Sequence, residues 1–114
     1  MKKNQRKFPR IPEPFEVHCR HRGALREPWH QVKTADLGAG GINIETDQLY
    51  DHGGTIELQV RLPSARSPLV LHGRIVRERP ILFHGMEYAI EFVDVTPDQQ
   101  VKIDDLVEFL RKRI

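Results

Sequence analysis

The chain has 114 residues, of which 39% are hydrophobic and 30% are charged, and its formal net charge is +2. One domain of this length can bury a core, but it leaves little room for a catalytic cleft between two lobes. The single cysteine, Cys19, excludes an intramolecular disulfide, and no stretch approaches the roughly 20 apolar residues of a transmembrane helix. The first residues also lack the apolar stretch of a secretory signal, so we expect a cytoplasmic protein without a membrane span.

The positive charge is concentrated at the N-terminus, where the first ten residues hold five basic side chains and no acidic one. Two of these, Arg6 and Arg10, are four positions apart, and Pro9 between them favours an extended chain. Guanidinium groups bind phosphates and guanine edges through paired hydrogen bonds, so this arrangement suits a compact polyanion. The sequence therefore predicts a basic N-terminal tail over 1–13 and one folded domain over 14–114.

Alternation of apolar and polar residues predicts six β-strands between residues 14 and 93. In such strands every second side chain is buried, and the other face is solvated. The connections are short and rich in glycine and proline, so neighbouring strands should be antiparallel. Pro80 and Gly85 mark the turn that we expect between the last two strands. The predicted strands centre on residues 15–19, 31–36, 42–44, 56–62, 69–77 and 86–92.

The periodicity changes near residue 97, where a C-terminal helix over 97–112 is predicted. Thr96 and Gln99 have the spacing of a capping box, and Pro97 suits the first helical position. Six short antiparallel strands would expose two sheet edges unless the sheet closed. The predicted fold is therefore mainly β, a six-stranded antiparallel β-barrel with one C-terminal α-helix. One apolar stripe of that helix should pack on the barrel: Ile103, Leu106, Val107, Leu110 and Ile114.

A glycine-rich segment, Asp36-Leu37-Gly38-Ala39-Gly40-Gly41, joins the second and third predicted strands. Its three glycines permit positive φ angles and would let a ligand approach the backbone amides closely. The carboxylate of Asp36 can accept hydrogen bonds from the N1–H and N2–H₂ groups of a guanine. The arginines can bind a phosphate and a base, and the carboxylate can bind the same base. Together these groups indicate a site for a guanine nucleotide.

These features resemble the PilZ domain family, whose members are receptors for the bacterial second messenger cyclic di-GMP. The family pattern is RxxxR before a β-barrel, then D/N-x-S-x-x-G between strands two and three, then a C-terminal helix. The resemblance extends from Arg6 to the last helix, and GRIVR at 73–77 and YAIEF at 88–92 look like the last two strands of the family. It implies that the protein binds cyclic di-GMP and needs no other cofactor.

The resemblance also implies roles for individual residues. Arg6 and Arg10 match the two arginines that hold phosphates and guanine faces, Asp36 matches the acidic position, and Gly41 matches the terminal glycine. Gly38 stands where the family has serine, and losing one neutral hydrogen bond costs roughly 0.5–1.5 kcal/mol. The charge-assisted arginine contacts are stronger, so we expect weakened rather than abolished binding.

Three further residues are additional candidates for the same site. Lys7 and Gly40 lie inside the two motifs, and Arg77 on the fifth predicted strand could line the ligand face. Residues 1–10 have little apolar material, and ordering them costs roughly 1–2 kcal/mol of backbone entropy per residue. We therefore expect the ligand to order the tail against the barrel and to create a surface for a downstream protein partner.

No catalytic residue and no metal site is predicted. Cys19 and Ser64 lack a recognisable general base in the sequence, and His18 and His21 would point to opposite faces of one strand. The expected protein is therefore a non-enzymatic receptor.

One alternative is a nucleotide-independent adaptor of PilZ-like fold that binds motility or pilus-assembly proteins, which the missing hydroxyl at Gly38 favours. A barrel that binds oligonucleotides is less well supported, because aromatic residues are only 7% of the chain and the charge after the tail is net negative. We therefore do not expect a nucleic acid partner.

Overall fold

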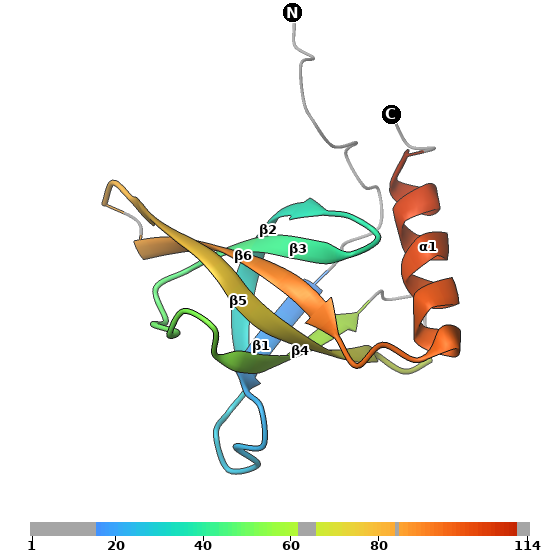
Figure 1. Ribbon diagram of the computed structural model, residues 1–114, viewed down its shortest axis with the longest axis horizontal. Coiled ribbons are helices and arrows are strands. Elements are labelled where there is room, and N and C mark those ends of the chain that lie inside the picture. The colour runs from blue at the N-terminus through green and yellow to red at the C-terminus, as the bar shows by residue number, and fades with distance from the viewer. Residues whose placement is uncertain (1–15, 62–65, 84, 112–114) are drawn as a thin grey trace, which may run out of the picture.

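A computed structural model of the protein describes residues 16–61, 66–83 and 85–111. Six antiparallel strands form a closed barrel, and one helix follows them at the C-terminal end (Figure 1). This confirms the predicted mainly β fold with one C-terminal helix. The elements are β1 (Glu16–His21), β2 (His30–Leu37), β3 (Gly41–Thr46), β4 (Thr55–Arg61), β5 (Leu69–Ile81), β6 (Gly85–Val93) and α1 (Pro97–Arg111).

The barrel closes through β1, which pairs with β2 on one side and with β4 on the other. The order around the barrel is β1-β2-β3-β6-β5-β4, and all six pairs are antiparallel. Closure gives each strand a hydrogen-bonded neighbour on both sides, although some neighbours pair with only part of the strand, and this shortens the exposed sheet edges.

The core lies inside the barrel and follows the predicted alternation. In β4, for example, Ile56, Leu58 and Val60 are buried, and the residues between them are more exposed. Cys19 is fully buried, as the alternation in β1 predicts. Burial raises the pKa of its thiol to about 11, although a 3.0 Å hydrogen bond between its Sγ atom and the Tyr50 hydroxyl opposes the rise.

The fifth strand is longer than predicted. We expected it to end near residue 77 and the chain to turn around Pro80, but β5 continues to Ile81, and Pro80 pairs with Met86 of β6. The last pair between β5 and β4 is at Arg74, so beyond this residue β5 has a strand neighbour on one side only. A proline is tolerated at such an edge because no neighbouring strand requires its missing N–H group.

The C-terminal helix begins as predicted. The Gln99 backbone N–H donates to the Thr96 hydroxyl, and the Thr96 N–H donates to the Gln99 side chain, both at 3.1 Å, which confirms the capping box. Ile103 and Leu106 are buried in the core, and Val107 and Leu110 pack against it; Ile114 lies outside the described residues.

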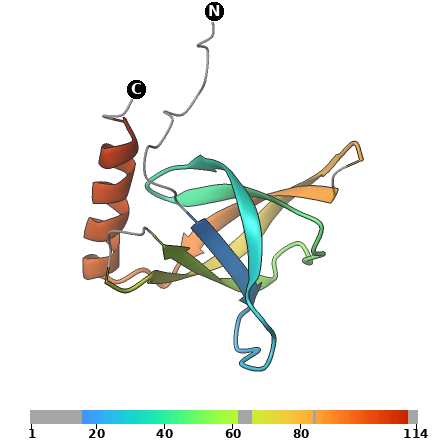
Figure 2. The same ribbon diagram turned by 180° about the vertical axis from the view of Figure 1, so that it is seen from behind.

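Helix α1 lies beside the barrel, next to the connection between β2 and β3 (Figures 1 and 2). A hydrogen bond joins the helix to the start of β5, where the Gln99 Nε2 group donates to the Val70 carbonyl at 2.9 Å. In the described parts of the chain, no helix is long and apolar enough to cross a membrane.

Candidate functional site

The predicted site residues divide into two groups. Arg6, Lys7 and Arg10 lie outside the described residues. The structure describes the other five, four of them where β2 turns into β3 and one on β5: Asp36, Gly38, Gly40, Gly41 and Arg77.

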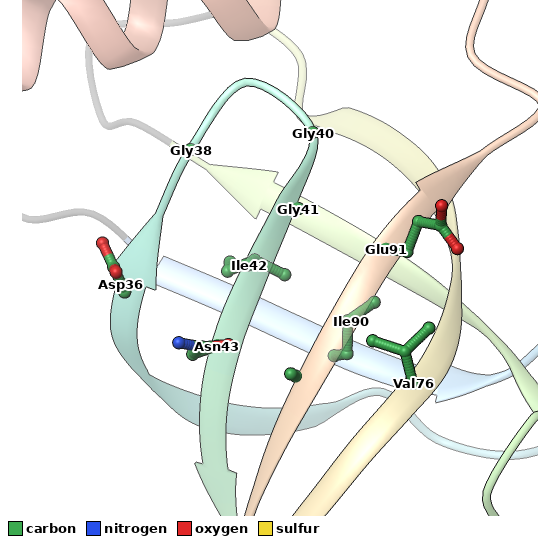
Figure 3. A pocket seen from close by; sticks show the side chains of 10 residues that line it. Asp36, Gly38, Gly40, Gly41, Ile42, Asn43, Val76, Ile90 and Glu91 are labelled. Carbon is green, nitrogen blue, oxygen red and sulfur yellow. The ribbon is translucent and has the colours of Figure 1, made fainter.

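Two adjoining hollows lie on the outside of the barrel along β2, β3, β6 and β5. The first, of about 340 Å³, is lined by all four predicted residues of the β2–β3 connection (Figure 3). The second, of about 370 Å³, is lined by Arg77 and shares Asn43 and Ala89 with the first. We call the two hollows together the outer groove. The fold thus brings the five described candidates to one continuous surface.

A row of cross-strand partners runs along the floor of the outer groove. Asp36 on β2 pairs with Asn43 on β3, Asn43 pairs with Ala89 on β6, and Ala89 pairs with Arg77 on β5. Directly paired residues share a face of the sheet and lie about 4.5–5.5 Å apart, so the row spans on the order of 15 Å. A carboxylate lies at one end, a guanidinium lies at the other, and the centre is small and uncharged.

The neighbouring rows of cross-strand partners also contain charged side chains, and in each of these rows the charges pair within the row. Arg74 donates to Glu91 at 2.6 Å on one side, and Arg79 donates to Glu87 on the other. Within the described residues, neither Asp36 nor Arg77 has an ion-pair partner. Their charges are therefore available to a molecule bound in the outer groove.

The turn of residues 38–41, which we call the glycine turn, is closed by a 2.9 Å hydrogen bond from the Gly38 N–H to the Gly41 carbonyl. Its three glycines would permit positive φ angles, but none of them adopts one. In the described chain the positive-φ glycines are instead Gly23, Gly53 and Gly85. The glycine turn reverses the chain with ordinary φ values, so its glycines are not required by backbone conformation.

A steric requirement explains one of these glycines, Gly41. A Cβ atom at Gly41 would lie 2.3 Å from the Ile90 carbonyl oxygen, so β3 and β6 can approach each other only with glycine there. At Gly40 a Cβ would meet nothing within 4 Å, and at Gly38 the nearest atom would be the Gly41 carbonyl oxygen at 4.0 Å. Gly38 and Gly40 therefore leave open space above the backbone of the glycine turn.

Two residues of the outer groove, Asn43 and Ala89, were not identified from the sequence. The alternation within the third and sixth predicted strands places both side chains on the outer face. Their positions beside Asp36 and Arg77 depend on strand register, including one irregularity between Thr34 and Asp36 and another between Ile75 and Arg77. This register is fixed by contacts between distant segments and is not visible in the local pattern.

A second polar cluster lies on the far side of the barrel from β3 and β6, and we call it the paired face. Arg20 donates to Glu57 at 2.8 Å, and His72 lies 3.5 Å from the same carboxylate. The Arg20 guanidinium also lies over the Trp29 ring, 4.2 Å from its centroid. Each charge at the centre of this cluster has a partner, which is typical of a structural role.

The loop beside the paired face contains another such contact. Glu27 accepts hydrogen bonds from the His21 backbone and faces the rings of both His21 and His30. Burial would raise the pKa of its carboxyl, but the hydrogen bonds from His21 and the nearby histidine charges outweigh that effect and lower the pKa. In the described residues, no group of three or more His, Cys, Asp or Glu side chains is placed to hold a metal ion.

The family model of the PilZ domain matches residues 4–109. The chain belongs to the PilZ domain family. The matched region contains Arg6 and Arg10 as well as the glycine turn, so both sequence motifs fall inside it. No match was found among curated proteins.

Solved structures share the fold of this PilZ domain. The inhibitor of motility MotI/DgrA from Bacillus subtilis has 17% identity and a TM-score of 0.60, with 95% of this chain and 51% of that chain covered. The PilZ domain of CeSA from a cellulose-synthesizing bacterium has 20% identity and a TM-score of 0.56, with coverage of 85% and 92%. The PilZ domain of Escherichia coli YcgR, solved with cyclic di-GMP, has 13% identity and a TM-score of 0.57, with coverage of 90% and 92%. The chain thus spans about half the length of the MotI chain.

Proposed function

We propose that this PilZ domain is a cytoplasmic, non-enzymatic receptor that binds cyclic di-GMP in the outer groove. The proposed ligand-binding residues are Arg6, Arg10, Asp36 and Gly41, with Gly38 in the place of the family's serine. The observation that carries the proposal is the row from Asp36 to Arg77, whose two end charges have no ion-pair partner within the described chain.

Asp36 is suited to recognise a guanine base. It is exposed at the end of β2, and its side chain lies at the edge of the groove beside Asn43 (Figure 3). A carboxylate in this position can accept the two parallel donors on the Watson–Crick edge of guanine. The open space at Gly40 lets a flat base approach the backbone of the glycine turn.

Arg77 supplies the opposite charge at the other end of the row. Its guanidinium can form paired hydrogen bonds with a phosphate or with the O6 and N7 atoms of guanine. A ligand with two bases and two phosphates offers groups for both ends of the groove. We therefore retain Arg77 as an additional ligand residue, with Lys7 and Gly40 as further candidates.

The register of β1 and β2 makes a contribution from the N-terminal tail feasible. Val17 pairs with Val32, and the two strands are antiparallel, so the start of β1 points toward the end of β2 that carries Asp36. Arg10 precedes Glu16 by six positions, which is a reach of at most about 20 Å along an extended chain. Arg10 can therefore reach a ligand in the outer groove, and this supports ligand-driven ordering of the tail.

A nucleotide-independent adaptor is the second candidate, and Gly38 is the observation that favours it. Without the hydroxyl of the family's serine, the site loses a hydrogen bond worth roughly 0.5–1.5 kcal/mol, although water could bridge the space. Such an adaptor would bind motility or pilus-assembly proteins directly. It would show no saturable response to cyclic di-GMP.

Amide hydrogen exchange tests the proposed site directly. Addition of cyclic di-GMP should slow exchange in residues 36–41 and around Arg77, and GMP at equal phosphate should have much less effect. The paired face provides the internal control, because exchange around Arg20 and Glu57 should not change. Unaltered exchange in residues 36–41 at saturating ligand would contradict the receptor function and favour the adaptor.

A further inference from the structure

The glycine turn is hydrogen-bonded to the segment that ends β6 and begins α1. The carbonyl of Gly40 accepts a 2.9 Å hydrogen bond from the Phe92 N–H, and the carbonyl of Ala39 accepts a 3.1 Å hydrogen bond from the Gln100 Nε2 group. Figure 3 shows the turn reaching toward the helix. Two successive carbonyl groups of the proposed ligand-binding turn are thus held by residues on either side of the capping box.

The side chain of Gln100 is fixed from two directions. Its Nε2 group also donates to the Asp104 carboxylate at 3.0 Å, one helical turn further along α1. Both partners of this group are acceptors, so the amide must present its NH₂ group to them. The Gln100 backbone N–H donates to the Thr96 carbonyl at 2.9 Å, which anchors the residue in the first turn of the helix.

We propose that Gln100 is a positioning residue that couples the ligand-binding turn to helix α1. The coupling rests on the proposed function for its ligand, cyclic di-GMP. A ligand that contacts Asp36 and the amides of the glycine turn must shift or rigidify the Ala39 carbonyl, and this changes its bond to Gln100. By linkage, if the ligand favours the bonded arrangement of α1 by a given factor, that arrangement raises the ligand affinity by the same factor.

Gln99 offers a matched comparison in the same helical turn. Its Nε2 group donates to the Val70 carbonyl of β5, and its side chain also completes the capping box. Gln99 therefore holds α1 to the barrel without touching the glycine turn. If Gln100 had only a structural role, replacing Gln99 would disturb the molecule at least as much.

The first experiment uses the full chain without ligand and compares Gln100→Met with Gln99→Met. Methionine has a similar length and helix propensity but cannot donate a hydrogen bond. The reporters are the amides of Gly38 and Phe92, whose hydrogen bonds close and hold the glycine turn. Exchange at Gly38 and Phe92 should be several-fold faster in Gln100→Met and unchanged in Gln99→Met, and Gln99→Met should lower the thermal midpoint more. Equal acceleration in both variants, or none in Gln100→Met, would overturn the positioning role.

The second experiment adds cyclic di-GMP. In the wild type, exchange should slow both in residues 36–41 and in the first turns of α1, over 97–104. In Gln100→Met, the slowing should persist in the turn and disappear from the helix, and affinity should fall about two- to ten-fold.

The two claims fail in different ways. Protection of the turn without protection of the helix in the wild type would overturn the coupling and leave the receptor function intact. If cyclic di-GMP gives no protection anywhere, the receptor function fails and the coupling to its ligand fails with it. The ligand-free comparison of Gln100→Met with Gln99→Met still decides whether Gln100 positions the turn.

Discussion

The paired face and the outer groove lie on different sides of the same barrel and use their charged side chains differently. On the paired face, Glu57 joins Arg20 and His72, and the Arg20 guanidinium also covers Trp29. In the outer groove, Asp36 and Arg77 end a row whose centre is uncharged, and within the described residues neither has an ion-pair partner. Charges that find partners within the fold contribute to stability, whereas charges left without partners around a hollow are available to a ligand. Substitutions on the two surfaces should therefore have opposite signatures.

The largest effect on binding is expected from the tail. Arg10→Ala should weaken cyclic di-GMP binding by about ten-fold or more, because a charge-assisted hydrogen bond contributes roughly 1.5–3 kcal/mol. Arg6→Ala should weaken it clearly as well. Both variants should leave the thermal midpoint of the ligand-free protein almost unchanged. Titration calorimetry measures the affinities, and wild-type affinity in both variants would refute the assignment of these arginines.

The paired face should show the opposite signature. Glu57→Gln removes the charge that joins Arg20 and His72, whose side chains are mostly buried, and should lower the free energy of unfolding by about 1–2 kcal/mol. Its affinity for cyclic di-GMP should remain that of the wild type. Urea unfolding and calorimetry give the two quantities. Weaker binding in a folded Glu57→Gln protein would show that the two surfaces are not separate.

Arg77 tests the far end of the row. Arg77→Ala should weaken cyclic di-GMP binding by about three- to ten-fold with no loss of stability, since within the described chain the side chain makes no ion pair. Arg77→Lys keeps the charge but loses the planar fork, so its affinity should fall between those of the wild type and the alanine variant. Equal affinity in all three proteins would remove Arg77 from the site.

The smallest effect is expected from restoring the hydroxyl. Gly38→Ser should tighten binding about two- to twelve-fold, the equivalent of one neutral hydrogen bond. The structure removes the main objection to this substitution, because Gly38 does not have a positive φ and its Cβ would meet nothing closer than 4.0 Å. The thermal midpoint should not fall. Weaker binding in a stable Gly38→Ser protein would mean that the ligand occupies the space above Gly38.

Local patterns in the sequence predicted most of the fold. Period-two alternation located all six strands, and the capping box located the start of α1, because both depend on residues close together in the chain. The extension of β5 through Pro80 was missed because it depends on where β4 stops pairing with β5, at Arg74. In a sequence alone, a proline usually indicates a turn. Its place inside a strand can be inferred only when that part of the strand is known to lie at a sheet edge.

The surface of the candidate site could be predicted only in part, for the same reason. The motifs pointed to Asp36 and the glycine turn, but the glycines do not use the positive φ angles that they permit. Gly41 is instead required by the close approach of Ile90. Asn43 and Ala89 enter the groove only through the register of β2, β3, β5 and β6. The roles of Arg6 and Arg10 stay predictions, since both lie outside the described residues.

Titration calorimetry of the wild-type protein with cyclic di-GMP, with GMP at equal phosphate as the control, tests the central claim most directly. We predict saturable binding of cyclic di-GMP and much weaker binding of GMP, because only the dinucleotide can engage Asp36, Arg77 and the tail arginines together. Absence of saturable heat with a large excess of cyclic di-GMP, from a protein shown to be folded, would contradict the receptor function.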